Sequence, residues 1–155
     1  MNQLIIVLLF LQLTSCMNNK KPLNQFDLEQ VKKTINEANK IYGDRFKIVD
    51  RNWYADKYCK DACVMPEKMN SICGIDSIIK YYYNDGKNKD FIIVIKEVEV
   101  FGNQELVVEE GVYDFPNGEG GSFDKGKFIA IWKIEEGKWK IYREIWNSSI
   151  EGKTN

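Results

Sequence analysis

The chain has 155 residues, 44% of them hydrophobic and 13% aromatic, and its formal net charge at pH 7 is −1. This length fits one domain with a substantial core, and the mixed, weakly charged composition argues against a nucleic-acid surface, which needs a basic stripe. Because the chain has no histidine, Ser-His-Asp and Cys-His catalysis and zinc binding through imidazole are excluded. Acid-base chemistry must therefore use carboxylates, Tyr, Lys or Cys.

The amino-terminal residues have the pattern of a targeting segment. Residues 4–11 form an apolar run that is too short to span a bilayer and is typical of a signal peptide. The sequence Leu13-Thr14-Ser15-Cys16 follows and resembles a bacterial lipobox, although residues 1–3 contain no Lys or Arg. The alternative is an ordinary secretory signal with an incidental cysteine.

We therefore predict a lipoprotein signal peptide over residues 1–15, lipidation of Cys16, and a polar tether over residues 16–25. This organisation places the protein in the cell envelope, anchored to the lipid bilayer and facing outside the cytoplasm. Two or more acyl chains anchor a protein stably, which a diacylated cysteine would provide.

A first helix is predicted from Asp27, with Gly43 interrupting its pattern. Its apolar residues at helical spacing are Leu28, Val31, Ile35, Ala38, Tyr42, Phe46 and Val49. Asp50 is positioned to cap a second helix over residues 51–58. A short strand over residues 62–65, a loop over residues 67–73 and a third helix over residues 74–86 follow.

From residue 91 the hydrophobic period changes to two, which predicts strands over residues 91–101, 106–115, 126–134 and 138–148. The last two flank residues 135–137, a short Gly-containing turn that favours a hairpin. Helices followed by long antiparallel strands predict an α+β fold with the helices on one face of the sheet. The Gly-rich residues 118–121 join two strands rather than opening a helix, so a dinucleotide site is excluded.

Three local patterns together carry a family resemblance. They are Asp50 followed by residues 58–66, the segment of residues 74–78 that opens the third helix, and the hairpin that ends in Arg143-Glu144-Ile145-Trp146-Asn147-Ser148. In this order and spacing they resemble the nuclear transport factor 2-like (NTF2-like) superfamily, in its SnoaL-like and ketosteroid-isomerase-related branch. The resemblance covers residues 26–148, which we predict as the domain, and residues 149–155 form a tail.

The resemblance implies a cone-shaped, cystatin-like fold in which N-terminal helices pack on a curved antiparallel sheet. It also implies a pocket at the open end of the cone and a homodimer formed through the sheet. It implies no particular reaction, because members include isomerases, dehydratases and binding proteins.

Strand alternation selects the residues expected to face the pocket. One face carries Glu109, Gly111 and Tyr113, and another carries Phe128, Ala130 and Trp132. On the last strand, either Arg143 or the set Tyr142, Glu144 and Trp146 faces the cavity. The predicted ligand-binding residues are Tyr58, Met65, Tyr82, Tyr113, Trp132, Arg143, Trp146 and Asn147.

Glu109 and Glu144 are the candidate catalytic carboxylates. An apolar pocket raises the pKa of a glutamate, which suits a general acid or base near neutral pH. Proton abstraction next to a carbonyl would also need a donor to the oxyanion, such as Tyr58 or Tyr113. The alternative is that Arg143 forms a structural ion pair with one of the glutamates.

Three cysteines remain after Cys16, and an extracytoplasmic location allows a disulfide among them. Cys63–Cys73 or Cys59–Cys73 would close the intervening loop, and Cys59–Cys63 is possible if their Cα atoms lie within about 7 Å. A metal site would need a fourth ligand that is not evident. We predict no metal and no cofactor.

The sequence thus predicts a membrane-anchored domain that binds a small, mostly apolar molecule, with no reaction assigned. The first alternative is a carboxylate-based isomerase, dehydratase or hydrolase of the ketosteroid-isomerase-like type. The second is a dimeric interaction domain whose cavity is filled by its own side chains.

Overall fold

The structure of the protein is a computed structural model that describes residues 26–83 and 91–150. The predicted signal peptide, Cys16 and the tether lie outside the described residues, as do the predicted end of the third helix and the tail beyond Ile150. Within the described part of the chain, no helix has both the length and the apolar character needed to cross a membrane.

In the described residues, three helices precede the long strands. They are α1 (Leu28–Ile48), α2 (Arg51–Lys57) and α3 (Ile75–Tyr82). The carboxylate of Asp27 caps α1 by accepting the backbone N–H of Glu29 at 3.2 Å, and Asp50 caps α2 by accepting the N–H of Trp53 at 3.1 Å. These caps satisfy backbone donors that the first turn of a helix leaves unpaired.

Gly43 does not end α1, because the helix continues to Ile48. A Cβ atom at position 43 would lie 2.8 Å from the backbone carbonyl oxygen of Ile93. The glycine therefore lets α1 approach the sheet closely beside the start of β3 (Val94–Gly102).

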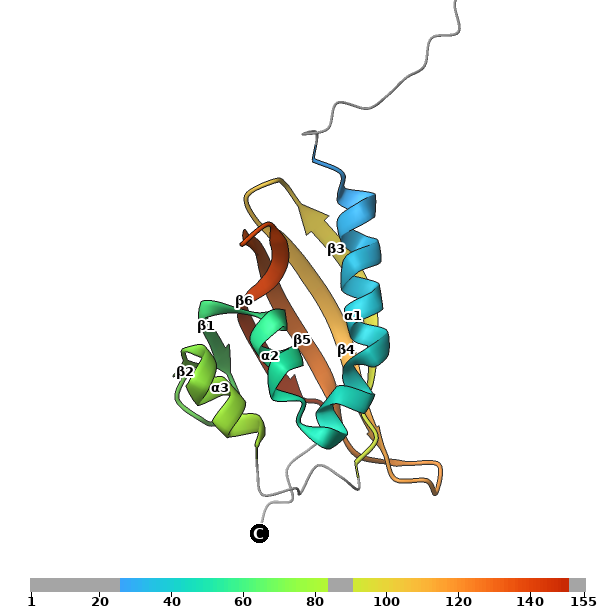
Figure 1. Ribbon diagram of the computed structural model, residues 1–155. Helices are drawn as coiled ribbons and strands as arrows, with labels where there is room; N and C mark the ends of the chain where they lie inside the picture. Colours follow the sequence, from blue (N-terminus) through green and yellow to red (C-terminus); the bar gives the residue numbers. More distant parts are fainter. Residues whose placement is uncertain (1–25, 84–90, 151–155) are drawn as a thin grey trace, which may run out of the picture.

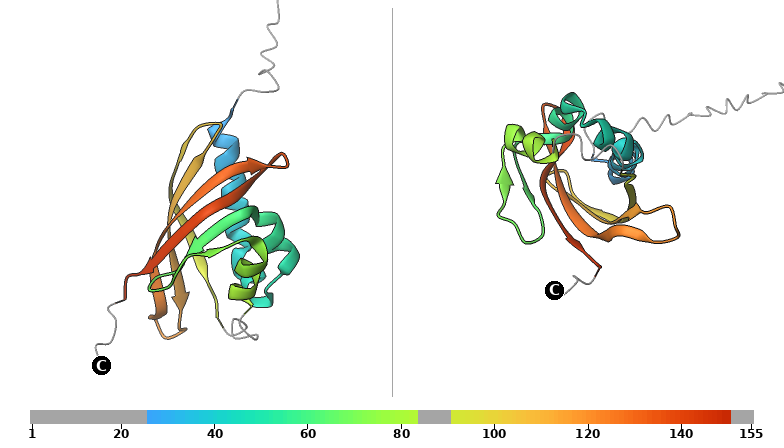
Figure 2. Two further views of the ribbon diagram at one scale, coloured as in Figure 1. Left: turned by 90° about the vertical axis from the view of Figure 1, so that its left-hand side faces the viewer. Right: turned by 90° about the horizontal axis from the view of Figure 1, so that it is seen from below.

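One six-stranded sheet has the order β2-β1-β6-β5-β4-β3. The other strands are β1 (Tyr58–Met65), β2 (Ile72–Cys73), β4 (Val107–Pro116), β5 (Ser122–Glu135) and β6 (Lys138–Ser148). All neighbours pair antiparallel except β1 and β6, which are parallel. The sheet is curved, and the helices pack on it (Figures 1 and 2). The predicted α+β arrangement of helices on a curved sheet is confirmed.

The first strand differs most from its prediction. β1 begins at Tyr58, four residues before the predicted strand, because α2 ends at Lys57 and the chain turns directly into the sheet. The predicted loop over residues 67–73 ends in β2, whose Cys73 pairs with Cys63 of β1. β5 also begins earlier, at Ser122, because Asp124 pairs with Phe115 at the far end of β4.

A disulfide joins Cys63 of β1 to Cys73 of β2, with the two Sγ atoms 2.04 Å apart. Of the three pairings that the sequence leaves open, this is the one present. Cys59 is a buried free thiol. The bridge closes the short connection between an outer strand of the sheet and its neighbour, which restricts the unfolded chain.

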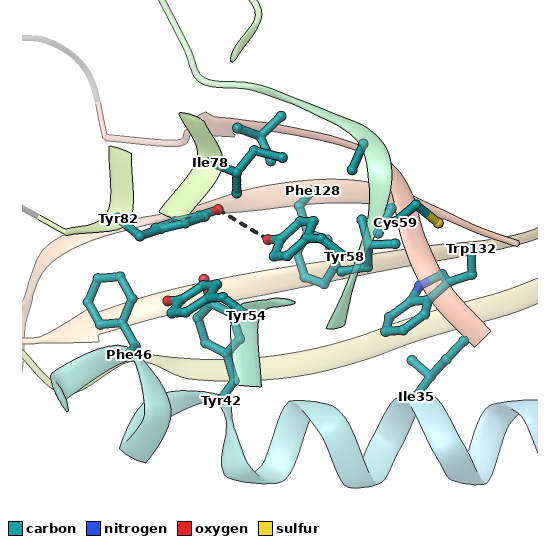
Figure 3. Packing of buried hydrophobic residues seen from close by; sticks show 14 of the residues in the cluster. Ile35, Tyr42, Phe46, Tyr54, Tyr58, Cys59, Ile78, Tyr82, Phe128 and Trp132 are labelled. Carbon is teal, nitrogen blue, oxygen red and sulfur yellow. Dashed lines mark hydrogen bonds between the residues drawn. The ribbon is translucent and has the colours of Figure 1, made fainter. Parts of the chain in front are cut away.

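The core lies between the helices and the sheet and is unusually rich in tyrosine. The largest fully buried side chains are Trp132, Tyr54, Tyr58, Ile35, Ile78 and Ile141. The rings of Tyr54 and Tyr82 stack with their centres 4.9 Å apart, and Figure 3 shows these rings together with Tyr58 and Ile78. Burying one large apolar side chain contributes about 1.5–3 kcal/mol, so these residues fix α2 and α3 on the sheet.

Candidate functional site

A cavity of about 240 Å³ lies between the helices and the sheet. Its lining is mostly aromatic and aliphatic, with a few polar groups, which is the usual character of a small-molecule site. The apolar lining residues are Tyr42, Phe46, Tyr81, Tyr82, Ile93, Ile95, Tyr113, Phe115, Phe128, Ile141 and Trp146. The polar ones are Asn39, Lys57, Glu109, Asp124 and Glu144.

Glu109 projects from β4 into this cavity and is 1% exposed. Its Oε1 accepts a hydrogen bond of 2.5 Å from Asn39 Nδ2 of α1, and its Oε2 accepts one of 2.9 Å from Trp132 Nε1 of β5. Burial raises the pKa of Glu109 to about 7, although Asn39, Lys57 and Trp132 oppose the rise. A carboxyl group with this pKa can gain or lose a proton at neutral pH.

Glu144 of β6 shares the cavity and is held by a tyrosine. The Tyr58 hydroxyl donates a 2.5 Å hydrogen bond to Glu144 Oε2 and lies 3.3 Å from the Tyr82 hydroxyl, a contact drawn in Figure 3. Burial, followed by the charge of Glu144, raises the pKa of Tyr58 well above its ordinary value. Tyr58 therefore remains a hydrogen-bond donor at physiological pH.

Arg143 does not form the ion pair with Glu109 or Glu144 that the sequence left open. Its guanidinium lies 3.7 Å from the centre of the Tyr142 ring and donates to the carbonyl oxygen of Asp61 at 3.1 Å. None of the described carboxylates pairs with it. Neither candidate glutamate is therefore neutralised by Arg143.

A β-bulge in β6 explains why Arg143 and Glu144 separate in this way. Ile131 pairs with Arg143 and Trp132 pairs with Ile141, so Tyr142 is the extra residue. Such a residue shifts the alternation of side chains, and both Ile141 and Glu144 line the cavity although they are three positions apart. Tyr142, which simple alternation groups with Glu144, does not line it.

The structure brings together only part of the predicted ligand-binding set. Tyr82, Tyr113 and Trp146 line the cavity with the two glutamates. Tyr58 and Trp132 are not in its lining and act as donors to those glutamates.

Three of the predicted residues lie elsewhere. Met65 and Asn147 line a different groove, beside Lys127 and Ile129. Asn147 lies there because it follows Trp146, and successive side chains of a strand point to opposite faces. Arg143 lies with Tyr142, as described above. Met65, Arg143 and Asn147, which the sequence predicts as pocket residues, therefore lie outside this cavity.

Sequence reasoning missed Lys57, Asn39 and Asp124. Lys57 is 8% exposed, and its Nζ lies 4.0 Å from the centre of the Tyr42 ring. Helical spacing could have indicated Lys57, because this residue follows Trp53 by four positions and so shares a helix face with a large aromatic residue. Asn39 follows Ile35 by four residues on the buried face of α1 in the same way.

Gly111 shapes the cavity by having no side chain. A Cβ atom there would lie 2.4 Å from two ring atoms of Phe128 on β5. The Phe128 ring therefore lies across β4 at this point, between the positions of Glu109 and Tyr113. The sequence grouped these residues on inward faces, and Glu109, Tyr113 and Phe128 do line the cavity.

One group of possible metal ligands lies outside the cavity. Cys59, Asp61 and Glu135 each have a ligand atom within 4.8 Å of the others. However, Asp61 is paired with Lys133 Nζ at 3.1 Å, and burial raises the pKa of the Cys59 thiol to about 11. Since a thiol binds metal as the thiolate, this group gives no support for a metal centre.

Comparison with protein-family models and with curated proteins gives no match. Solved structures do match. An NTF2-like superfamily protein from Salmonella enterica serovar Typhimurium has a TM-score of 0.63 at 15% identity, covering 83% of this chain and 100% of that chain. An NTF2-like protein of unknown function from Pseudomonas putida has a TM-score of 0.65 at 11% identity, covering 82% and 89%.

A ketosteroid isomerase-like protein from Erwinia carotovora atroseptica has a TM-score of 0.60 at 13% identity, covering 76% of this chain and 95% of that chain. At identities this low, the likeness concerns the fold alone. The chain has the NTF2-like, cystatin-like fold that the sequence predicts.

Proposed function

We propose that the cavity binds a small, mostly apolar molecule whose polar group is directed toward Glu109 and Glu144. The observation that carries this proposal is an aromatic-lined space that contains the carboxylates of Glu109 and Glu144 beside that of Asp124. Neither glutamate forms an ion pair with a described residue. The rings provide apolar contact area, and the carboxylates provide orientation and selectivity. The cavity volume of about 240 Å³ suits a molecule of modest size.

The second candidate is proton transfer on the same molecule, in an isomerisation, dehydration or hydrolysis. The observation that favours it is the pKa of about 7 at Glu109, because a general base works best when its pKa is near the working pH. Tyr82 lines the same cavity, and its hydroxyl would be the donor to a developing oxyanion.

Native mass spectrometry of the protein purified from its own host tests the binding role. We expect the wild-type protein to retain a small molecule and the Ile95→Trp variant to lose it, because Ile95 lines the cavity and a larger ring would fill it. The matched control is Val94→Trp, since Val94 precedes Ile95 on β3, does not line the cavity and is 52% exposed.

An unchanged small-molecule mass in the Ile95→Trp variant would place the molecule outside the cavity and contradict the proposal. A wild-type protein without any retained mass would favour a cavity filled by its own side chains. A retained molecule then becomes the substrate on which the Glu109→Gln variant is assayed for lost turnover.

We also propose that the protein is held at the cell envelope through a lipid on Cys16. The support is the sequence pattern of residues 1–16. Replacing Cys16 by Ala should move the protein from the membrane fraction to the soluble fraction and remove the lipid mass. Cys59→Ala is the matched control and should stay with the membrane, because Cys59 is buried in the core. A Cys16→Ala variant that remains membrane-bound with its lipid contradicts this proposal.

A second copy of the chain is the partner that we propose for the outer face of the sheet. Val112, Ile129 and Ile145 lie on the adjacent strands β4, β5 and β6 and are 39%, 44% and 48% exposed. Aliphatic side chains on neighbouring strands form a surface that a self-complementary interface would cover. This support is independent of the cavity.

A further inference from the structure

Lys57 is a buried amine in the cavity wall that the binding role does not use. It is the last residue of α2 and is 8% exposed. Its Nζ lies 4.0 Å from the centre of the Tyr42 ring and 4.8 Å from that of Trp53. Among the residues that the structure describes, it forms no hydrogen bond and no ion pair.

Lys140 provides the comparison within the same chain. It is 5% exposed, but its Nζ lies 3.3 Å from a carboxylate oxygen of Glu136 and 3.8 Å from one of Glu135. An amine that is engaged by two carboxylates is not free to approach a carbonyl carbon. The two lysines therefore differ in pairing and not in burial.

Burial of Lys57 favours the neutral amine. Burial among Tyr42 and Trp53 lowers the pKa of Lys57, and the negative charges of Glu144 and Glu109 only partly oppose this. A lysine desolvated in an apolar wall is the arrangement that makes an amine a nucleophile toward carbonyl compounds. The aromatic lining offers contact area to the body of such a compound.

We propose that Lys57 Nζ is a nucleophile that forms an imine with a small aromatic or otherwise apolar aldehyde or ketone bound in the cavity. This inference rests on the proposed function, because the compound must first enter the cavity. It goes further by naming the reacting atom and the class of ligand.

The step needs no oxidant, reductant or cofactor. The Nζ lone pair attacks the carbonyl carbon, the C=O π electrons move to oxygen, and a proton passes from nitrogen to that oxygen to give a carbinolamine. The hydroxyl group then takes a proton and leaves as water while the C=N bond forms. Glu109 lines the same cavity and has a pKa of about 7, so it can give this proton and recover one from the nitrogen.

Reductive trapping tests the proposal. The purified protein is incubated with benzaldehyde and sodium cyanoborohydride, which converts an imine into a stable benzyl amine, and the site is located by peptide mapping. We expect benzylation at Lys57 before any other lysine, and loss of this early adduct in Lys57→Met. Lys140→Met is the matched control and should keep the adduct on Lys57.

Benzylation spread over the exposed lysines without preference for Lys57 would overturn the proposal, as would early benzylation of Lys140. If Lys57→Met does not fold, the peptide map of the wild-type protein decides the matter. Calorimetric titration with benzyl alcohol, which has no carbonyl group, separates this inference from the binding role. Binding of benzyl alcohol without benzylation of Lys57 overturns the imine alone, whereas absence of both overturns the imine and counts against the binding role.

Discussion

The unfolding free energy of the wild-type protein is expected to fall as the pH rises, and replacing Glu109 by Gln is expected to remove this fall. The pKa of Glu109 is about 7 in the folded protein, against an ordinary value of 4.5, and this difference corresponds to about 3 kcal/mol. The folded state binds this proton more tightly than the unfolded chain does. The stabilisation is therefore complete below about pH 4.5 and is lost as the pH rises through about 7.

Urea denaturation at a series of pH values measures this effect as the difference in unfolding free energy between wild type and variant. We expect the wild-type protein to lose about 3 kcal/mol relative to Glu109→Gln between about pH 4.5 and pH 7. Glu110→Gln is the matched control, because Glu110 is the exposed neighbour on the same strand. A difference that is constant with pH, or one that grows in favour of the wild-type protein, would show that Glu109 is not desolvated.

Replacing Trp132 by Ala is expected to lower the unfolding free energy by about 3–5 kcal/mol, the usual cost of removing a large buried aromatic side chain. Trp132 is 2% exposed. Its indole N–H is also one of the two side-chain donors to Glu109. The substitution therefore leaves both a void and a carboxylate oxygen without its partner.

Trp132→Phe separates these two contributions, because it keeps most of the ring and removes only the donor. We expect it to cost about 1–3 kcal/mol and to raise the pKa of Glu109 further, since Trp132 lowers that pKa in the native protein. Chemical denaturation gives the first quantity, and its pH dependence gives the second. Trp139→Ala is the control, because Trp139 is only half-buried at the edge of the core. Equal losses for Trp132→Ala and Trp139→Ala would contradict the central position of Trp132.

The last strand shows what sequence patterns can and cannot predict. Hydrophobic alternation predicts the strand over residues 138–148, and β6 has these bounds, because apolar side chains recur on the inward face of a half-buried strand. The same alternation fails at Tyr142. A bulge depends on how β6 pairs with β5, so the sequence of β6 alone does not show it. Only the folded sheet could decide that Glu144 lines the cavity and Arg143 does not.

Non-local contacts account for the other differences. The parallel pairing of β1 with β6 joins Tyr58 to Ile141. No local sequence pattern predicts a pairing between residues so far apart along the chain. Lys57 was missed for a related reason. A lysine in a helix is normally exposed, so its spacing from Trp53 does not by itself decide its burial, which follows from the contact of Lys57 with Tyr42 of α1. Glu109 and Tyr113 were predictable because an uninterrupted strand alternates regularly.

The course of α1 determines how the molecule would face its surroundings. The described chain begins at Phe26, next to the start of α1, and the cavity is lined by Asn39, Tyr42 and Phe46 in the second half of that helix. Eighteen residues separate Leu28 from Phe46, which is about 27 Å along a helix axis. If the chain were held to a surface through its amino end, α1 would therefore separate that surface from the cavity. The residues of α1 that line the cavity would then lie in the half of the helix farther from that surface, and Figure 1 shows α1 running along the sheet.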